Sequence, residues 1–110
     1  MLDPKLQEEL QHSVDLGVKY LETEYEDWRT IIDLEKFNIA DYGSCVLAQA
    51  ARHDDLGTHY MDYVRHHELS NEWAITHGFN LDNDEIPDTG ERMDAWLTLQ
   101  ALWEKAIKDA

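Results

Sequence analysis

Cysteine, proline and glycine are scarce in this chain of 110 residues, which contains one, two and five of them respectively. The lone cysteine, Cys45, cannot form a disulfide within the chain, so cross-links are excluded as the source of its stability. With so few prolines and glycines, little interrupts helices, and no linker rich in these residues separates two domains. The sequence therefore predicts a single helical domain over residues 1–110.

Basic residues are also scarce: nine Lys and Arg against 24 Asp and Glu give a formal net charge of -15. Nucleic acid and anionic membranes repel such a chain at long range, which argues against direct binding to either. A basic protein partner is compatible with this charge. The hydrophobic content of 43%, with four Trp and five Tyr, is enough for a core and is unlike an acidic disordered tail.

Long apolar runs are missing as well. No segment approaches the roughly 20 apolar residues that a bilayer crossing needs. The first residues, 1–5, are acidic and amphipathic, whereas a signal peptide begins basic and continues apolar. With the single cysteine, these absences predict a cytoplasmic protein, in the bacterial host cytoplasm if the chain is encoded by a phage.

Most of the chain repeats apolar residues at helical spacing, which predicts an all-α fold. We expect a small single-domain bundle of about four to five helices, with long N- and C-terminal helices packed together. The first helix has a cap at Asp3 and a first-turn proline at Pro4, and should run to about Tyr25. One stripe of this helix is apolar and comprises Leu6, Leu10, Val14, Val18, Leu21 and Tyr25.

The last helix should begin at Asp88 or Thr89, with Glu91 placed to close a capping box on Asp88. Its apolar residues predict one broad buried face, made of Met93, Trp96, Leu97, Ala101, Trp103, Ala106 and Ile107.

Shorter segments lie between these helices. A helical turn is expected over 28–32, and the apolar run 45–51 fits either a helix or a buried strand. Residues 59–69 should face the core through Tyr60, Met61, Val64 and, less clearly, Tyr63. Ser70 caps a short helix over 71–77, which Gly78 ends, and residues 79–88 form an acidic loop.

Three sequence islands stand out by their order and spacing. They are Trp28-Arg-Thr-Ile-Ile-Asp33-Leu34, then Cys45-Val-Leu-Ala-Gln49, then Glu72-Trp-Ala-Ile-Thr-His-Gly-Phe79. The set resembles a group of small acidic proteins of actinobacteria and especially their bacteriophages, although Ala48 stands where that group would have glycine. The resemblance implies a phage or actinobacterial origin and an intracellular setting, and it assigns no catalytic residue.

The best metal-binding candidates are His59, Asp62 and His66, whose spacing would place two imidazoles and a carboxylate on one helix face. Ligands from one straight helix rarely enclose an ion alone, so the site would need a further carboxylate, such as Asp54 or Asp55. A solvated polar helix face is the favoured interpretation, and we expect no cofactor. Cys45 is expected to be a buried structural residue whose apolar surroundings raise its pKa.

Acidic residues gather in two segments. Seven lie between Arg65 and Arg92, where Lys and Arg are absent, and a second cluster follows the first helix. The first group is Glu68, Glu72, Asp82, Asp84, Glu85, Asp88 and Glu91, and the second is Glu22, Glu24, Glu26 and Asp27. From charge alone, a solvated face that maintains solubility is the simpler interpretation.

If the acids converge, however, they could dock on a basic surface such as the nucleic-acid channel of an enzyme, as a DNA mimic. Tyr25, Trp28 and Tyr63 border acidic residues and are candidate aromatic anchors, or core residues. The leading hypothesis is a non-enzymatic, phage-encoded module that binds a basic, nucleic-acid-binding host or phage protein.

Two alternatives belong to other classes of protein. One is a metal-dependent enzyme built on His59, Asp62 and His66. The other is a homo-oligomer joined through the last helix, since Trp96 and Trp103 lie a heptad apart.

Overall fold

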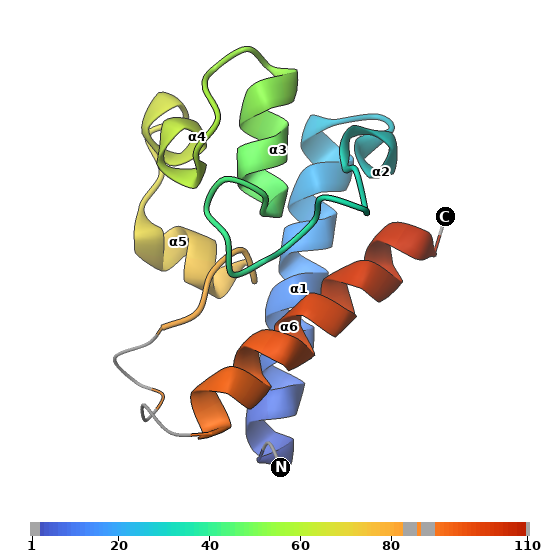
Figure 1. Ribbon diagram of the computed structural model, residues 1–110, viewed down its shortest axis with the longest axis vertical. Coiled ribbons are helices and arrows are strands. Elements are labelled where there is room, and N and C mark those ends of the chain that lie inside the picture. Colours follow the sequence, from blue (N-terminus) through green and yellow to red (C-terminus); the bar gives the residue numbers. More distant parts are fainter. Residues whose placement is uncertain (1–2, 83–85, 87–89, 110) are drawn as a thin grey trace.

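The computed structural model describes residues 3–82, 86 and 90–109, and six helices lie within these ranges. Two are long and four are short (Figure 1). Their bounds are α1 Pro4–Glu24, α2 Trp28–Ile31, α3 Val46–His53, α4 Tyr60–His66, α5 Asn71–Thr76 and α6 Gly90–Lys108. The described chain is therefore all-helical, as predicted, with one helix more than the four or five expected.

The two long helices pack against each other, which confirms the predicted pairing of the chain ends. Figure 1 shows α6 crossing α1, with the four short helices gathered beside the C-terminal half of α1. The radius of gyration is 13.2 Å, close to the roughly 13 Å expected for one domain of this length. None of the described helices has the length and apolar character that crossing a membrane would require.

The indole of Trp103 lies at the centre of the core and is fully buried. It stacks on Phe79 with ring centroids 5.2 Å apart and meets Trp28 edge-on at 6.2 Å. Its Nε1 donates a hydrogen bond of 2.7 Å to the carbonyl oxygen of Gly78. One side chain of α6 thus joins the start of α2 to the segment after α5.

A close helix approach at Gly17 makes room for this indole. A Cβ atom built at Gly17 would overlap the carbonyl oxygen of His77 and lie 2.9 Å from the ring of Trp103. Glycine at this position therefore allows α1 to contact α6 and the end of α5 together.

The three helices α3, α4 and α5 end in the same way. Each is followed by a residue with positive φ, namely Asp55, Glu68 and Gly78. The next residue donates its backbone N–H to a carbonyl five positions back, at 2.8 Å in all three cases. This is the Schellman motif, and the residue after the turn is apolar each time, as that motif favours. The residues after the turn are Leu56, Leu69 and Phe79.

Two glutamines hold the irregular segment between α2 and α3. Gln49 accepts a hydrogen bond from the backbone N–H of Asp33 at 2.6 Å, and Gln100 accepts one from Ile39 at 2.7 Å. Gln49 is 5% exposed, so its amide satisfies backbone groups that burial would otherwise leave unpaired. The segment is ordered by side chains rather than by secondary structure of its own.

The local predictions for the short segments agree with the structure. Residues 45–51 lie in a helix, α3, and its Cys45 cap, and not in a strand. Ser70 caps α5 by accepting a hydrogen bond from the backbone N–H of Trp73 at 3.0 Å, and Gly78 follows with φ 74°. The predicted capping box on Asp88 lies outside the described residues.

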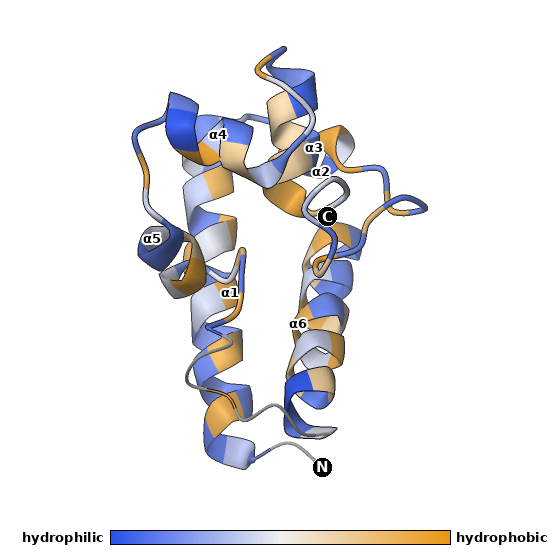
Figure 2. Ribbon diagram, turned by 60° about the vertical axis from the view of Figure 1, so that its left-hand side comes forward, coloured by the Kyte–Doolittle hydropathy of each residue, from blue (hydrophilic) through white to orange (hydrophobic). Residues whose placement is uncertain are grey.

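The prediction for the buried face of α6 is wrong in part. The residues that face α1 are Ala95, Leu99, Trp103 and Ile107, at a spacing of four. Met93 and Leu97, which were predicted to be buried, are 64% and 60% exposed, and Ala101 is also exposed. Because hydrophobic residues recur all along α6 (Figure 2), periodicity alone could not identify the side that contacts α1.

Candidate functional site

Asp82, from the first acidic cluster, lies far from the second cluster. Asp82 lines a small cavity with Leu6 and Leu10, beside the N-terminal half of α1. Glu22 and Glu24 lie in the last turn of α1, and Glu26 and Asp27 lie between α1 and α2. The second cluster is therefore at the opposite end of α1 (Figure 1). With a rise of about 1.5 Å per residue, the separation along α1 is roughly 20 Å.

The remaining acids of the first cluster are also dispersed. Glu68 follows α4 at the turn before α5, Glu72 lies in the first turn of α5, and Glu91 lies in the first turn of α6. Asp84, Glu85 and Asp88 are outside the described residues. The described acids of the first cluster therefore lie on several separate elements.

A hollow lined by several acids occurs at the second cluster, where α1 ends and α2 begins. It has a volume of about 480 Å³ and is lined by Glu22, Glu26, Asp27, Trp28, Arg29 and Thr30. Three of these residues are carboxylates and one is a cation, so the lining has a formal charge of -2. We call this feature the acidic hollow.

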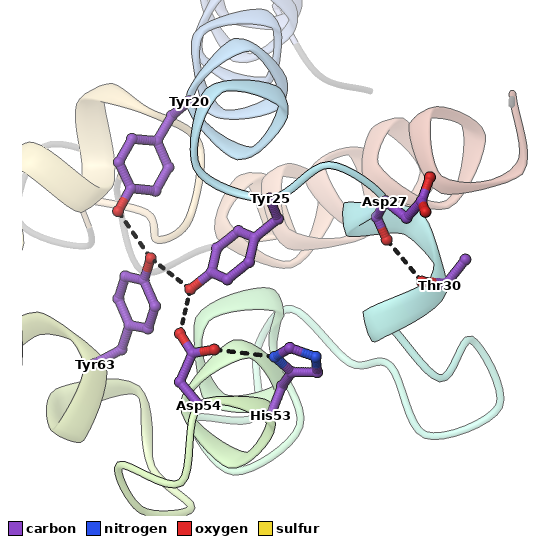
Figure 3. Close-up of polar contacts among 7 residues, drawn as sticks. All are labelled: Tyr20, Tyr25, Asp27, Thr30, His53, Asp54 and Tyr63. Carbon is purple, nitrogen blue, oxygen red and sulfur yellow. Dashed lines mark hydrogen bonds and ion pairs between the residues drawn. The ribbon is translucent and has the colours of Figure 1, made fainter.

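The chain bends sharply at this hollow because α1 ends at an extended Tyr25 and α2 restarts three residues later. Asp27 takes the N-cap position of α2 but makes no side-chain cap hydrogen bond. Thr30 instead donates its hydroxyl to the backbone carbonyl of Asp27 at 2.7 Å (Figure 3). The Asp27 carboxylate is thus left exposed at the edge of the hollow.

Arg29 offsets only part of this negative charge. Its Nε donates to the carbonyl oxygen of Ala106 at 2.9 Å, and its guanidinium lies 4.6 Å from the centre of the Trp28 ring. Its Nη2 is 4.0 Å from a carboxylate oxygen of Glu22, whose side chain is 55% exposed. In the described part of the chain, neither Glu26 nor Asp27 forms an ion pair.

Two of the three candidate aromatic anchors, Trp28 and Tyr63, are buried, which corrects the prediction that they could contact a partner. Trp28 is 2% exposed and Tyr63 is fully buried, so neither can enter a partner's pocket. Trp28 packs on Trp103, and the Tyr63 ring contacts His67 with centroids 4.3 Å apart. Their alternative role as core residues is confirmed. Tyr25 is half-buried, and its hydroxyl points inward.

The inward-pointing hydroxyl of Tyr25 belongs to a hydrogen-bonded network that the sequence did not predict (Figure 3). The hydroxyl oxygens of Tyr20 and Tyr63 are 2.8 Å apart, and those of Tyr63 and Tyr25 are 3.2 Å apart. Tyr25 donates to Oδ2 of Asp54 at 2.5 Å, and Oδ1 of Asp54 lies 2.9 Å from Nδ1 of His53. This tyrosine network joins the end of α1 to α3 and α4.

The hydroxyl protons of this network point toward Asp54. An ionised carboxylate can only accept, so the single phenolic proton of Tyr25 goes to Asp54. The Tyr63 proton then goes to Tyr25, and the Tyr20 proton goes to Tyr63. Burial raises the pKa of all three tyrosines, and the hydrogen bonds that Tyr20, Tyr25 and Tyr63 donate raise it further.

Burial and hydrogen bonding have opposite effects on the pKa of Asp54. Burial acts to raise the pKa of this carboxyl, but the hydrogen bonds from Tyr25 and His53 outweigh that effect, and the pKa lies below its usual value of 3.8. The carboxylate is therefore ionised at neutral pH, with one hydrogen bond to each of its oxygens. The network resembles a structural clamp more than a proton-transfer site.

Two of the three metal-ligand candidates, His59 and Asp62, form a helix cap instead. Nδ1 of His59 accepts a hydrogen bond from the backbone N–H of Met61 at 3.0 Å. Oδ2 of Asp62 accepts from the backbone N–H groups of Thr58 and His59 at 3.1 and 3.0 Å. In the residues that the structure describes, no three His, Cys, Asp or Glu side chains form a ligand set, so His59, Asp62 and His66 do not meet as one.

The prediction for Cys45 is confirmed. Its side chain is 1% exposed, and burial raises the pKa of the thiol to about 11. A protonated, inaccessible thiol is a poor nucleophile.

Sequence reasoning missed both the tyrosine network and the enclosed shape of the acidic hollow. The network joins residues 29 to 43 positions apart, and no motif marks such a pairing. One feature of the sequence could have indicated the hollow. The acidic run from Glu24 to Asp27 lies between two helical patterns, which indicates a bend lined with acids.

Comparison of the chain with protein-family models, curated proteins and solved structures gives no match. The site must therefore be interpreted from its own geometry and charge.

Proposed function

We propose that this chain is a non-enzymatic binding module that docks on a basic protein, and that the acidic hollow receives a cationic side chain of the partner. The observation that carries the proposal is a concave surface lined by three carboxylates against one arginine. A lysine or arginine inserted there would meet Glu26 and Asp27 at short range, where charge pairing is least screened.

A nucleic-acid-binding protein is the class of partner that fits best, because its basic surface complements a chain of net charge -15. The resemblance to small acidic proteins of actinobacteriophages supports a host or phage protein as that partner. Electrostatic steering would speed encounter, and the hollow would supply the specific contact.

The test separates the hollow from overall charge. One variant carries Glu22→Gln, Glu26→Gln and Asp27→Asn, and the control carries Glu8→Gln, Glu9→Gln and Asp15→Asn on the exposed N-terminal half of α1. Both change the net charge equally. Proteins would be captured from an actinobacterial lysate with each variant at low and high salt, and the retained protein purified for titration.

We expect a basic protein that wild type and the control retain at low salt, and that the hollow variant loses. With about 1 kcal/mol for each of two or three contacts, the dissociation constant should rise roughly 30- to 150-fold in the hollow variant. Equal weakening in both variants would show that only net charge matters. Capture of no basic protein by wild type would overturn the proposal.

A further inference from the structure

The exposed side of α6 has a pattern that the acidic hollow does not explain. Asp94, Leu97, Thr98, Ala101, Leu102 and Lys105 recur at helical spacing and line a shallow groove together with Gln7 of α1. The middle of this face is mostly apolar: Leu97 is 60% exposed and Ala101 is exposed, whereas Leu102 is half-buried and also packs against the core. An acid lies at one end of the face and a base at the other.

The six positions are symmetric about the midpoint between Leu99 and Gln100. If a second α6 lies antiparallel on this face, Asp94 of each copy meets Lys105 of the other, and Leu97 meets Leu102. Thr98 meets Ala101 near the axis, where small side chains allow close approach. The same symmetry places Glu91 of one copy opposite Lys108 of the other, one helical turn further from the axis. Both residues are exposed.

We propose that a second copy of this chain covers the outer face of α6 in an antiparallel, two-fold homodimer. A two-fold interface must be complementary to itself, and this face is so in both charge and apolar character. The fully buried Trp103 takes no part in this contact, so the interface is not the one that Trp96 and Trp103 would form as a heptad pair.

Overall charge opposes this dimer. Two copies of charge -15 repel each other over the whole surface, whereas the cross-helix ion pairs act only at contact. Added salt screens long-range repulsion between exposed charges more than it weakens apolar contact. The dimer should therefore become stronger as salt rises, whereas docking on a basic partner becomes weaker. The two proposals are independent and have opposite salt dependence.

The experiment is sedimentation velocity of the whole chain over a concentration series, at about 50 mM and about 1 M NaCl. Wild type should shift from monomer to dimer with concentration, with a lower dissociation constant at high salt. Leu97→Glu should raise that constant at least 10-fold. Monomer at every concentration and salt for wild type would overturn the proposal, and so would unchanged association of Leu97→Glu.

Charge exchange tests the antiparallel register. Lys105→Asp should weaken association, because it opposes Asp94 of the partner with a second acid, and Asp94→Lys should weaken it by the mirror-image repulsion. The double exchange, Asp94→Lys with Lys105→Asp, should restore association. Lys19→Asp on the exposed side of α1 has the same net charge as Lys105→Asp and serves as its matched control. Equal weakening by Lys19→Asp, or no recovery in the double exchange, would contradict this register.

A cross-link reports the register directly. Mixing Thr98→Cys with Ala101→Cys under oxidising conditions should give more disulfide dimer than either variant alone, since these positions oppose each other across the axis. Circular dichroism would confirm that every variant is folded. Equal cross-linking in the mixture and in the single variants would overturn the antiparallel register.

Discussion

Gly17 is the residue on which the meeting of α1, α6 and the end of α5 depends. In an isolated helix, alanine would be more favourable than glycine by about 1 kcal/mol. Here the added methyl would overlap the carbonyl oxygen of His77 and the ring of Trp103. We expect Gly17→Ala to lower the free energy of unfolding by about 1–3 kcal/mol, measured by urea denaturation. Lys19→Ala, at an exposed position of the same helix, is a control that should change it by less than about 0.5 kcal/mol.

Tyr25 is the residue that links the tyrosine network to a charged group. Removing its hydroxyl leaves Asp54 without its closest donor, so Tyr25→Phe should destabilise the protein by about 1–3 kcal/mol at pH 7. It should also raise the pKa of Asp54.

This effect should depend on pH. The pKa of Asp54 is lowered by folding, so its stabilising effect is complete above the unfolded value near 3.8 and is lost as pH falls through the folded pKa. Denaturation of wild type and Tyr25→Phe at several pH values should show the cost shrinking toward pH 3. A cost that stays constant from pH 7 to pH 3 would show that the charge of Asp54 is not involved.

Three of the short helices, α3, α4 and α5, end in the same Schellman turn, and the turn after α4 is strained. Glu68 has φ 55°, a region where a side chain costs about 1 kcal/mol or more and glycine costs least. Gly78 fills the same position after α5. Glu68→Gly should therefore raise the free energy of unfolding by about 0.5–1 kcal/mol, as a shift in the thermal midpoint would show. Glu72→Gly, inside α5, should instead destabilise the protein.

The sequence predicts the ends of helices well, because the residues that cap a helix are close to it in the chain. Asp3 and Pro4 mark the start of α1, and Ser70 and Gly78 bracket α5, because caps depend on neighbours within a few residues. The predicted buried face of α6 is right for Trp103 and Ile107 and wrong for Met93 and Leu97, because these two are apolar, as Leu99 is. Which of them is covered depends on α1, some 80 positions earlier in the chain. For the same reason Tyr25, Asp54 and Tyr63 could be recognised singly but not as a network.

Charge acts on the molecule as a whole. With 24 acids and nine bases, the folded chain brings like charges closer together than the unfolded chain does. We expect the thermal midpoint to rise as NaCl increases from about 20 to about 500 mM, because salt screens this repulsion. Scanning calorimetry at low protein concentration, where dimers do not form, would measure the effect. An unchanged or falling midpoint would mean that local ion pairs outweigh the repulsion.

The position of Trp103 also has a consequence for the order of events during synthesis. A ribosome produces α1 to α5 before the helix that carries this indole, so the emerging chain can form local turns and caps but has no central side chain to pack around. Phe79 keeps its ring contacts with Tyr20 and Trp73, whereas Trp28 and Gly17 lack the indole that they meet in the folded chain. The nascent protein would therefore complete its core only after α6 has emerged, and apolar surface would stay exposed until then.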